Sequence, residues 1–149
     1  MIEINNESGE TVDEGRIQAL ALFALDKLRI HPQAELSVLF VDEATMAAYH
    51  EKFMGEPGPT DVLSFPMDEL RPPAGDEEPT AGMLGDIVLC PTVTAGQAAE
   101  AGRTPEQEQD YLLVHGLLHL LGFDHATDAE HKVMFDLNDA IIAEWAQSR

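Results

Sequence analysis

Short apolar runs divide the chain into strand-like and helix-like segments. Four of the runs are rich in β-branched or aromatic residues and are no longer than an ordinary strand, so they predict β-structure. The four segments are MIEINN (1–6), AELSVLFVD (Ala34–Asp42), TDVLSF (Thr60–Phe65) and GDIVLC (Gly85–Cys90). Pro59 and Pro66 flank the third segment. Because proline cannot donate a hydrogen bond to a neighbouring strand, we expect this segment at an edge of the sheet.

The apolar residues between and after these strands have helical spacing, and they predict about five helices. The helix starts are marked by a capping box at Thr11–Glu14 (TVDE), by Asp42, by Pro91, by Thr104 with Pro105, and by a second capping box at Thr127–Glu130 (TDAE). The first helix should end near Leu28, the second near Gly55 and the fourth at Gly122. The last helix places Met134, Leu137, Ile141 and Trp145 on one face.

Strands interleaved with helices predict an α+β fold with α/β/α layers, in which a small mixed sheet of about four strands is flanked by about five helices. The segment Met67–Gly82 is acidic and rich in proline and glycine. We interpret it as an exposed excursion, because too little chain lies on either side for it to separate two domains. Residues 1–149 are therefore expected to form one domain.

The charge of the chain is unusual. It has 28 acidic residues against 8 lysines and arginines, which gives a formal net charge of −20. Such a surface repels polyanions and attracts basic partners, and it lacks the clustered basic residues of a typical nucleic-acid binder, so no DNA partner is expected. No apolar run is long enough to span a membrane, and the N-terminus does not resemble a secretory signal. The single cysteine, Cys90, excludes an intrachain disulfide, which agrees with a cytoplasmic protein.

The stretch HGLLHLLGFDH carries three of the six histidines. His115 and His119 are four positions apart, so they share one face of a helix. Gly122 can end that helix and let His125 turn back beside them. This is the ligand spacing of the extended zincin motif. Three imidazoles would leave the fourth position of one Zn²⁺ ion per chain to a water molecule, as in catalytic zinc sites.

One position departs from the zincin pattern. A metalloprotease has its general-base glutamate directly after the first histidine, where this chain has Gly116. Without that carboxylate, peptide hydrolysis lacks its usual proton acceptor. Asp124 precedes the third histidine and is the candidate catalytic residue, as a base or by orienting a ligand, although a role in capping the turn is equally compatible with its position.

Three motifs in the same order carry a resemblance to a known family. HGLLHLLGFDH (His115–His125), GPTDVLSFP (Gly58–Pro66) and LGDIVLC (Leu84–Cys90) resemble the YbeY family of bacterial ribosomal RNA maturation endoribonucleases. The resemblance implies a zinc-dependent single-strand endoribonuclease that acts in processing of the 3′ end of small-subunit rRNA and in ribosome quality control. It also implies that His115, His119 and His125 bind the metal, in a cleft beside a mixed sheet.

The resemblance is incomplete near the second motif. Members of the family often have an arginine where this chain has Met54, so a cation that could bind phosphate is missing there. The nearest cations in sequence are Lys52 and Arg71. Three polar residues on the predicted edge strand could position a substrate, or could simply make a turn and face solvent: Thr60, Asp61 and Ser64.

Several other residues could be functional, but each has a simpler structural interpretation. Asp86 could approach the metal cleft but is better explained as a cap of its strand. Cys90 is expected to be a small buried apolar residue, since nothing near it has the spacing of a cysteine zinc site. His131 is expected on the surface of the last helix.

The leading hypothesis is therefore a cytoplasmic zinc endoribonuclease. Because the chain is so acidic, we expect weak binding to free RNA and delivery to rRNA in the small ribosomal subunit through a basic ribosomal protein. Two alternatives remain open. One is a zinc peptidase or amidase that lacks the zincin glutamate, and the other is a non-enzymatic ribosome-assembly factor with a structural metal.

Overall fold

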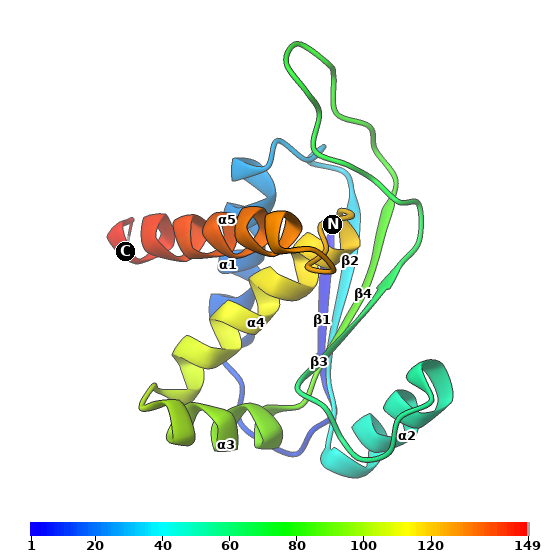
Figure 1. The fold of residues 1–149 in the computed structure, drawn as a ribbon, viewed down its shortest axis with the longest axis vertical. Coiled ribbons are helices and arrows are strands. Elements are labelled where there is room, and N and C mark those ends of the chain that lie inside the picture. Colours follow the sequence, from blue (N-terminus) through cyan, green and yellow to red (C-terminus); the bar gives the residue numbers. More distant parts are fainter. Residues whose placement is uncertain (149) are drawn as a thin grey trace.

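The computed structural model describes residues 1–148, which form five helices around a four-stranded sheet (Figure 1). In chain order the elements are β1 (Ile2–Asn6), α1 (Glu14–Lys27), β2 (Glu35–Phe40), α2 (Glu43–Met54), β3 (Val62–Pro66), β4 (Met83–Leu89), α3 (Pro91–Ala101), α4 (Pro105–Leu120) and α5 (Asp128–Gln147). The predicted α+β class is confirmed.

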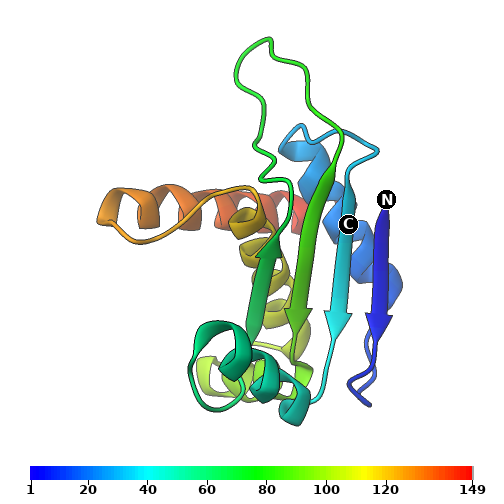
Figure 2. The same cartoon turned by 90° about the vertical axis from the view of Figure 1, so that its right-hand side faces the viewer.

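The sheet has the order β1-β2-β4-β3. β1 and β2 are parallel, β2 and β4 are parallel, and β3 runs antiparallel to β4. β3 therefore forms one edge, as the flanking prolines predict. Figure 2 shows β3 along the side of the sheet next to α4.

Most of the helices lie on one face of the sheet. α1, α4 and α5 cover this face, and their apolar side chains form the main core together with inward-facing residues of β2 and β4 (Figures 1 and 2). α2 lies on the opposite face, at the lower end of the sheet, where Met46 is buried with Leu63 and Val88. No helix among residues 1–148 is both long and apolar enough to cross a membrane.

The helix caps agree with the sequence at α2 and α4, whereas at α5 the predicted capping box forms only in its Thr127 half, without a hydrogen bond from the Thr127 N–H to the Glu130 side chain among the described residues. Asp42, Thr104 and Thr127 each accept a hydrogen bond from the backbone of the first helical turn, as expected. The predicted capping box at Thr11–Glu14 does not form, and α1 begins later than expected. Its cap is Asp13, whose carboxylate accepts a hydrogen bond of 3.1 Å from the Arg16 N–H. Aspartate is a stronger N-cap than threonine, so Asp13 rather than Thr11 caps α1.

Residues 67–82 form the expected excursion, which extends beyond one end of the sheet between β3 and β4 (Figure 1). Where the two strands come together again, Gly85 has a φ of 134°. A Cβ atom at this position would collide with the carbonyl group of Phe65. The close pairing of β3 with β4 at the base of the excursion therefore requires glycine.

Candidate metal centre

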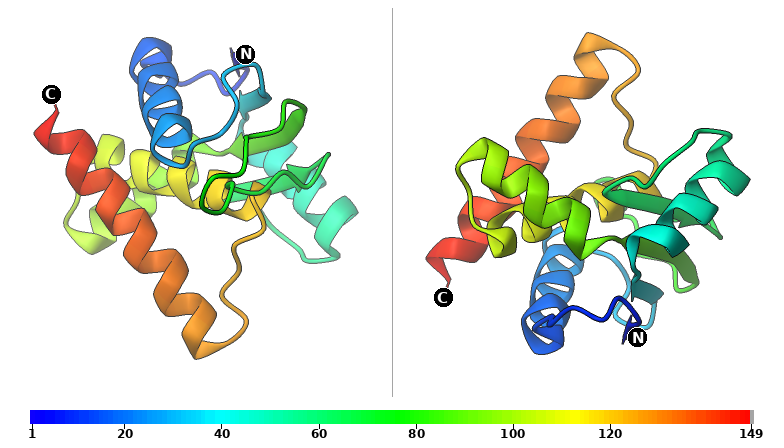
Figure 3. Two further views of the ribbon diagram at one scale, coloured as in Figure 1. Left: turned by 90° about the horizontal axis from the view of Figure 1, so that it is seen from above. Right: turned by 90° about the horizontal axis from the view of Figure 1, so that it is seen from below.

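α4 ends in a turn that brings the third histidine toward the first two. His115 and His119 lie one turn apart on α4, which ends at Leu120. Gly122 follows with a φ of 93°, and its N–H donates to the carbonyl of His119 at 3.0 Å. The N–H of Phe123 donates to the carbonyl of Leu118 at 3.0 Å. This pair of bonds is a Schellman motif, which reverses the chain after the helix. Figure 3 shows the segment that then leads to α5.

The three imidazoles have the arrangement of a metal site. One ligand nitrogen from each of His115, His119 and His125 lies within 4.8 Å of the other two. The Nε2 atoms of His115 and His119 are 3.2 Å apart. Two nitrogens on one tetrahedral Zn²⁺, each at about 2.0–2.1 Å from the ion, are separated by about 3.3 Å. The residues present therefore fit a single ion of this size.

The protonation states of the site also favour metal binding. Burial, together with the neighbouring His119 and His125, lowers the pKa of His115 from 6.5 to about 4. Burial and His125 also lower the pKa of His119. Both rings are therefore neutral at pH 7 and offer a lone pair. The Nδ1 atom of His115 is buried and has no hydrogen-bond partner among the described residues.

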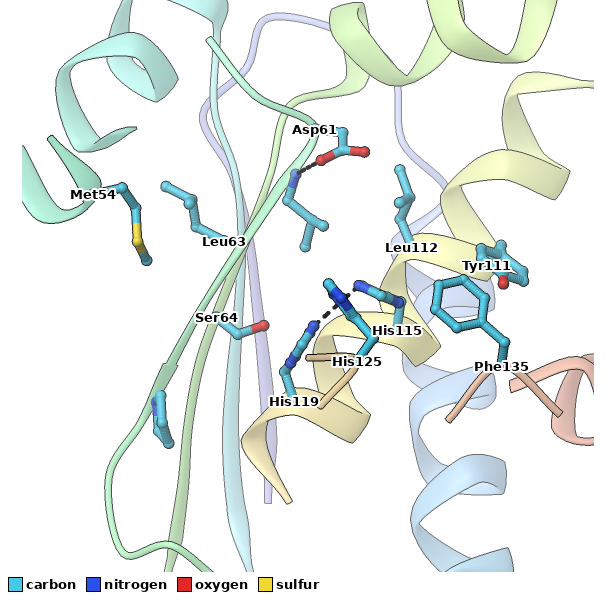
Figure 4. A pocket seen from close by; sticks show the side chains of 12 residues that line it. Met54, Asp61, Leu63, Ser64, Tyr111, Leu112, His115, His119, His125 and Phe135 are labelled. Atoms are coloured by element: carbon cyan, nitrogen blue, oxygen red, sulfur yellow. Dashed lines mark hydrogen bonds between the residues drawn. The ribbon is translucent and has the colours of Figure 1, made fainter. Parts of the chain in front are cut away.

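The histidines open into a cleft of about 580 Å³ between α4 and β3 (Figure 4). α4 forms one wall, β3 forms the other, and α5 contributes one aromatic ring. The lining residues are Met54, Asp61, Val62, Leu63, Ser64, Pro66, Tyr111, Leu112, His115, His119, His125 and Phe135.

Gly116 lies at the closest approach of α4 to the sheet. A Cβ atom at this position would be 3.1 Å from Cγ2 of Ile87, 3.1 Å from Oγ of Ser64 and 3.3 Å from Cγ2 of Val62. A side chain here would require these three side chains to shift, so the packing favours glycine. The sequence alone suggested only a lost catalytic group, and the structure adds that a zincin glutamate would have to displace neighbouring side chains of the sheet.

Two of the three predicted substrate residues line the cleft. Asp61 does so, and its carboxylate accepts hydrogen bonds from the N–H of Val62 at 2.7 Å and from the hydroxyl of Thr60 at 3.3 Å. Ser64 also lines the cleft, but its hydroxyl donates to the Gly116 carbonyl at 3.0 Å. Thr60 is not among the lining residues and supports Asp61 instead.

Asp124 is exposed and holds the histidine turn. Its Oδ1 accepts a hydrogen bond of 2.7 Å from the backbone N–H of His125. This is the turn-capping role that the sequence left open. Its negative charge also acts on His119, where it partly offsets the lowering of that ring's pKa. A catalytic role for Asp124 stays a prediction.

The other candidate residues lie outside the metal centre. His131 is exposed and stacks on Phe135 with 4.2 Å between the ring centroids. Cys90 is fully buried and free. Asp86 lies within β4 and does not cap it, and it borders a groove on the opposite face of the sheet with Phe65 and Tyr49.

The aromatic side of the cleft was not predicted from the sequence. Phe135 of α5 lies 5.6 Å from the His115 ring and 6.1 Å from the His125 ring, centroid to centroid. Tyr111 precedes His115 by one helical turn and also lines the cleft. The spacing of Tyr111 could have revealed it, whereas Phe135 arrives through packing between two helices.

The comparisons with known proteins agree with this geometry. The family model described as "Endoribonuclease YbeY" matches residues 3–146. The chain is 68% identical, over all of its length and 96% of the relative's, to Endoribonuclease YbeY of Cutibacterium acnes. It is 55% identical to Endoribonuclease YbeY of Thermobifida fusca, over 99% of the chain and 95% of that relative. The chain belongs to the YbeY endoribonuclease family. This confirms the resemblance and makes the chain a member of a family of hydrolytic nucleases.

A solved structure shares the fold. The solution structure of TM1509 from Thermotoga maritima matches 99% of the chain and 93% of its own length, with a TM-score of 0.62 and 25% sequence identity. The arrangement of sheet and helices therefore persists although most side chains differ.

Proposed function

We propose that the chain is a single-domain, zinc-dependent endoribonuclease that cleaves single-stranded RNA. Its biological role would be maturation of the 3′ end of small-subunit rRNA and quality control of ribosomes. The observation that carries the proposal is the set of three converging imidazoles in a cleft along the edge strand β3. Family membership supports the reaction class.

In this proposal each side chain of the cleft has a defined task. His115, His119 and His125 bind the metal through neutral ring nitrogens. A bound Zn²⁺ would supply Lewis acidity and a water molecule that ionises near neutral pH. Asp61 presents a carboxylate at the cleft wall, where it can accept a proton. Asp124, the second candidate for this role, keeps the backbone of His125 in place.

The apolar walls of the cleft would help to exclude water from the reacting groups. Leu112 is almost fully buried, and Tyr111 and Phe135 offer ring surfaces on the same side. Aromatic faces stack with unpaired bases of any sequence. A single strand could therefore lie between β3 and these rings with its backbone toward the histidines, whereas a duplex has no bases free to stack.

Charge argues for delivery by a partner. The chain has a net charge of −20, and the cleft is lined by no lysine or arginine among the described residues. Phosphate contacts normally dominate RNA affinity, so we expect weak binding to free RNA at physiological salt. A basic ribosomal protein would be attracted to the acidic surface and would bring the enzyme to the rRNA in the cytoplasm.

The decisive experiment measures metal content and cleavage together. Elemental analysis of purified wild type should give one zinc per chain, and a fluorescent single-stranded RNA should be cut. His119→Ala should lose both properties. His131→Ala is the matched control for metal content, because this histidine lies on the surface outside the proposed ligand set, and it should retain its zinc. Wild type without metal would overturn the metal proposal.

The two alternatives are tested with the same samples. A peptidase or amidase would cut a peptide library in the zinc-loaded form. The glycine at residue 116, where a zincin has its glutamate and where the packing is tight, argues against it. A non-enzymatic assembly factor would hold zinc, cut no RNA and keep its association with ribosomes in His115→Ala.

A further inference from the structure

The metal cleft contains a negative carboxylate, from Asp61, but no cation among its described lining residues. Positive charge besides that of a single ion would stabilise a bound phosphodiester, because a strand of RNA carries one negative charge per nucleotide. A lysine or arginine from outside the lining could supply it.

Most of the cations in residues 1–148 already have acidic partners. The ion pairs are Arg16–Asp110, Lys27–Glu144, Arg103–Glu108 and Lys132–Asp136. Arg29 donates to the carbonyls of Gly75 and Glu77 in the outer part of the excursion. Lys52 lies over the ring of Phe53, 5.3 Å from its centroid. Among the described cations, this leaves Arg71 as the one whose position bears on the metal centre.

Arg71 lies directly against the histidine turn. A Cβ atom built on Gly122 would be 2.9 Å from Nη2 of Arg71 and would collide with Nε and Cζ. The flat guanidinium therefore covers the Cα atom of Gly122, three residues after His119 and three before His125. Only glycine lets the guanidinium come this close to the backbone of residue 122. The absence of a side chain there therefore allows both the Schellman turn and the observed position of Arg71.

The guanidinium is held in place by its own loop. Nη1 donates to the carbonyls of Glu69 at 2.9 Å and Leu70 at 3.1 Å. Glu69 adopts a left-handed φ of 51°, an uncommon conformation for a residue other than glycine. Nη2 and Nε have no hydrogen-bond partner among residues 1–148, and the side chain is exposed. Nη1 is thus held by the two carbonyls, whereas the edge of the guanidinium formed by Nε and Nη2 is free to donate hydrogen bonds.

Arg71 follows the strand β3 that borders the cleft, and it lines a separate pocket of about 270 Å³ together with Glu69, Glu77 and Glu78. β3 ends at Pro66, which lines the cleft, and the chain continues from there to Arg71. Figure 2 shows this segment leaving β3 and passing the end of α4. His119 lies toward this end of the cleft, whereas Asp61 and Leu112 lie toward the other (Figure 4).

We propose that Arg71 binds a phosphate of the RNA strand that lies in the cleft, next to the phosphodiester at the histidines. The inference rests on the proposed ribonuclease function. The free edge of the guanidinium can donate two parallel hydrogen bonds to phosphate oxygens, which a lysine cannot reproduce. The cation that the sequence lacks at Met54 is in this way supplied from the excursion between β3 and β4.

The test is the salt dependence of cleavage of a single-stranded RNA oligonucleotide. We expect Arg71→Gln to raise KM about tenfold at low salt, the loss associated with one charge-assisted hydrogen bond. The slope of log(kcat/KM) against log[KCl] should become less negative by about 0.7, the contribution of one phosphate contact on a single strand. Arg71→Lys should restore the wild-type slope but should reverse the increase in KM only in part.

Arg29→Gln is the matched control, because it removes the same charge from a guanidinium that is also bound to carbonyls of the excursion. It should keep the wild-type slope and KM. Zinc content and melting temperature should be the same in all variants, which separates phosphate binding from a purely structural role.

The results distinguish failure of this inference from failure of the ribonuclease proposal. If wild type cleaves RNA and Arg71→Gln keeps the wild-type slope, or loses zinc or thermal stability along with activity, Arg71 does not bind phosphate. If zinc-loaded wild type cleaves no RNA, the proposed function itself falls and the phosphate role falls with it.

Discussion

The hydroxyl of Ser64 on β3 donates a hydrogen bond to the carbonyl oxygen of Gly116 on α4, with 3.0 Å between the two oxygens. This bond joins the edge strand to the histidine helix at the position where the helix has no side chain. The same contact defines the width of the cleft, because residues of β3 face residues of α4 across it. The absence of a side chain at residue 116 is therefore part of how the site is built.

A pair of glycine-to-alanine substitutions tests this packing. A Cβ atom added to Gly96, in the middle of α3, would have no atom within 4 Å, whereas one added to Gly116 would have three within 3.3 Å. We expect Gly96→Ala to stabilise the protein by about 0.5–1 kcal/mol through helix propensity. The free energy of unfolding of Gly116→Ala should be lower than that of Gly96→Ala by about 1–3 kcal/mol, because the added methyl group overpacks the contact between α4 and the sheet. Urea unfolding measures both, and equal effects would contradict the tight contact.

Removal of the metal should lower stability through the histidine set. A ligand present at one hundred times its Kd stabilises the folded state by about 2.7 kcal/mol. For a chain of this size, that amounts to roughly 5–10 °C in melting temperature. A chelator should therefore lower the melting temperature of zinc-loaded wild type and of His131→Ala by this amount. His119→Ala should melt at the same temperature with or without chelator.

Acid should destabilise the metal-free protein. The folded chain holds the pKa of His115 at about 4, below its ordinary value of 6.5, so the unfolded chain binds the proton more readily. The contribution of the neutral His115 ring to the free energy of unfolding is fully present above pH 6.5 and is lost as the pH falls toward 4. Between pH 7 and pH 5 we expect a loss of about 1 kcal/mol, smaller than the full shift implies because solvent screens the partly exposed ring, and urea unfolding in chelator measures it. His115→Gln should show a weaker dependence.

The two carboxylates near the histidines can be separated by amide substitution. Asp61→Asn should lower kcat by about 100-fold or more with unchanged zinc content, because Asp61 lines the cleft and is not in the ligand set. Asp124→Asn should have a smaller effect, because the amide oxygen can still accept the His125 N–H. Asp124→Ala removes that acceptor and should weaken zinc binding. A greater loss of kcat in Asp124→Asn would assign the base to Asp124.

Local chemistry made much of the site predictable. The spacing of His115, His119 and His125 and the glycine at the turn predict the histidine cluster without knowledge of the fold. The prolines beside β3 predict its edge position, which the sheet order confirms. Each of these features depends on residues that are close together in the sequence.

Long-range packing accounts for what was missed. Phe135 reaches the cleft only because α5 crosses α4, and Arg71 reaches Gly122 only because the excursion folds back from β3. At Gly116 the sequence pattern suggested a missing catalytic group, whereas the structure adds a contact with Ile87 of the central strand β4. The capping box predicted at Thr11 does not form, because Asp13, two residues later, is a stronger N-cap.

The histidine turn also has a consequence for the order of folding. Its three proposed ligands are confined to residues 115–125, so the chain needs to close only a short loop to bring them together. The opposite wall needs β3 to pair with β4 and α4 to dock on the sheet, which are contacts between segments far apart in the chain. A nascent chain could thus bind its ion before the cleft between α4 and β3 has formed. Refolding with zinc present should then begin from a preformed end of α4.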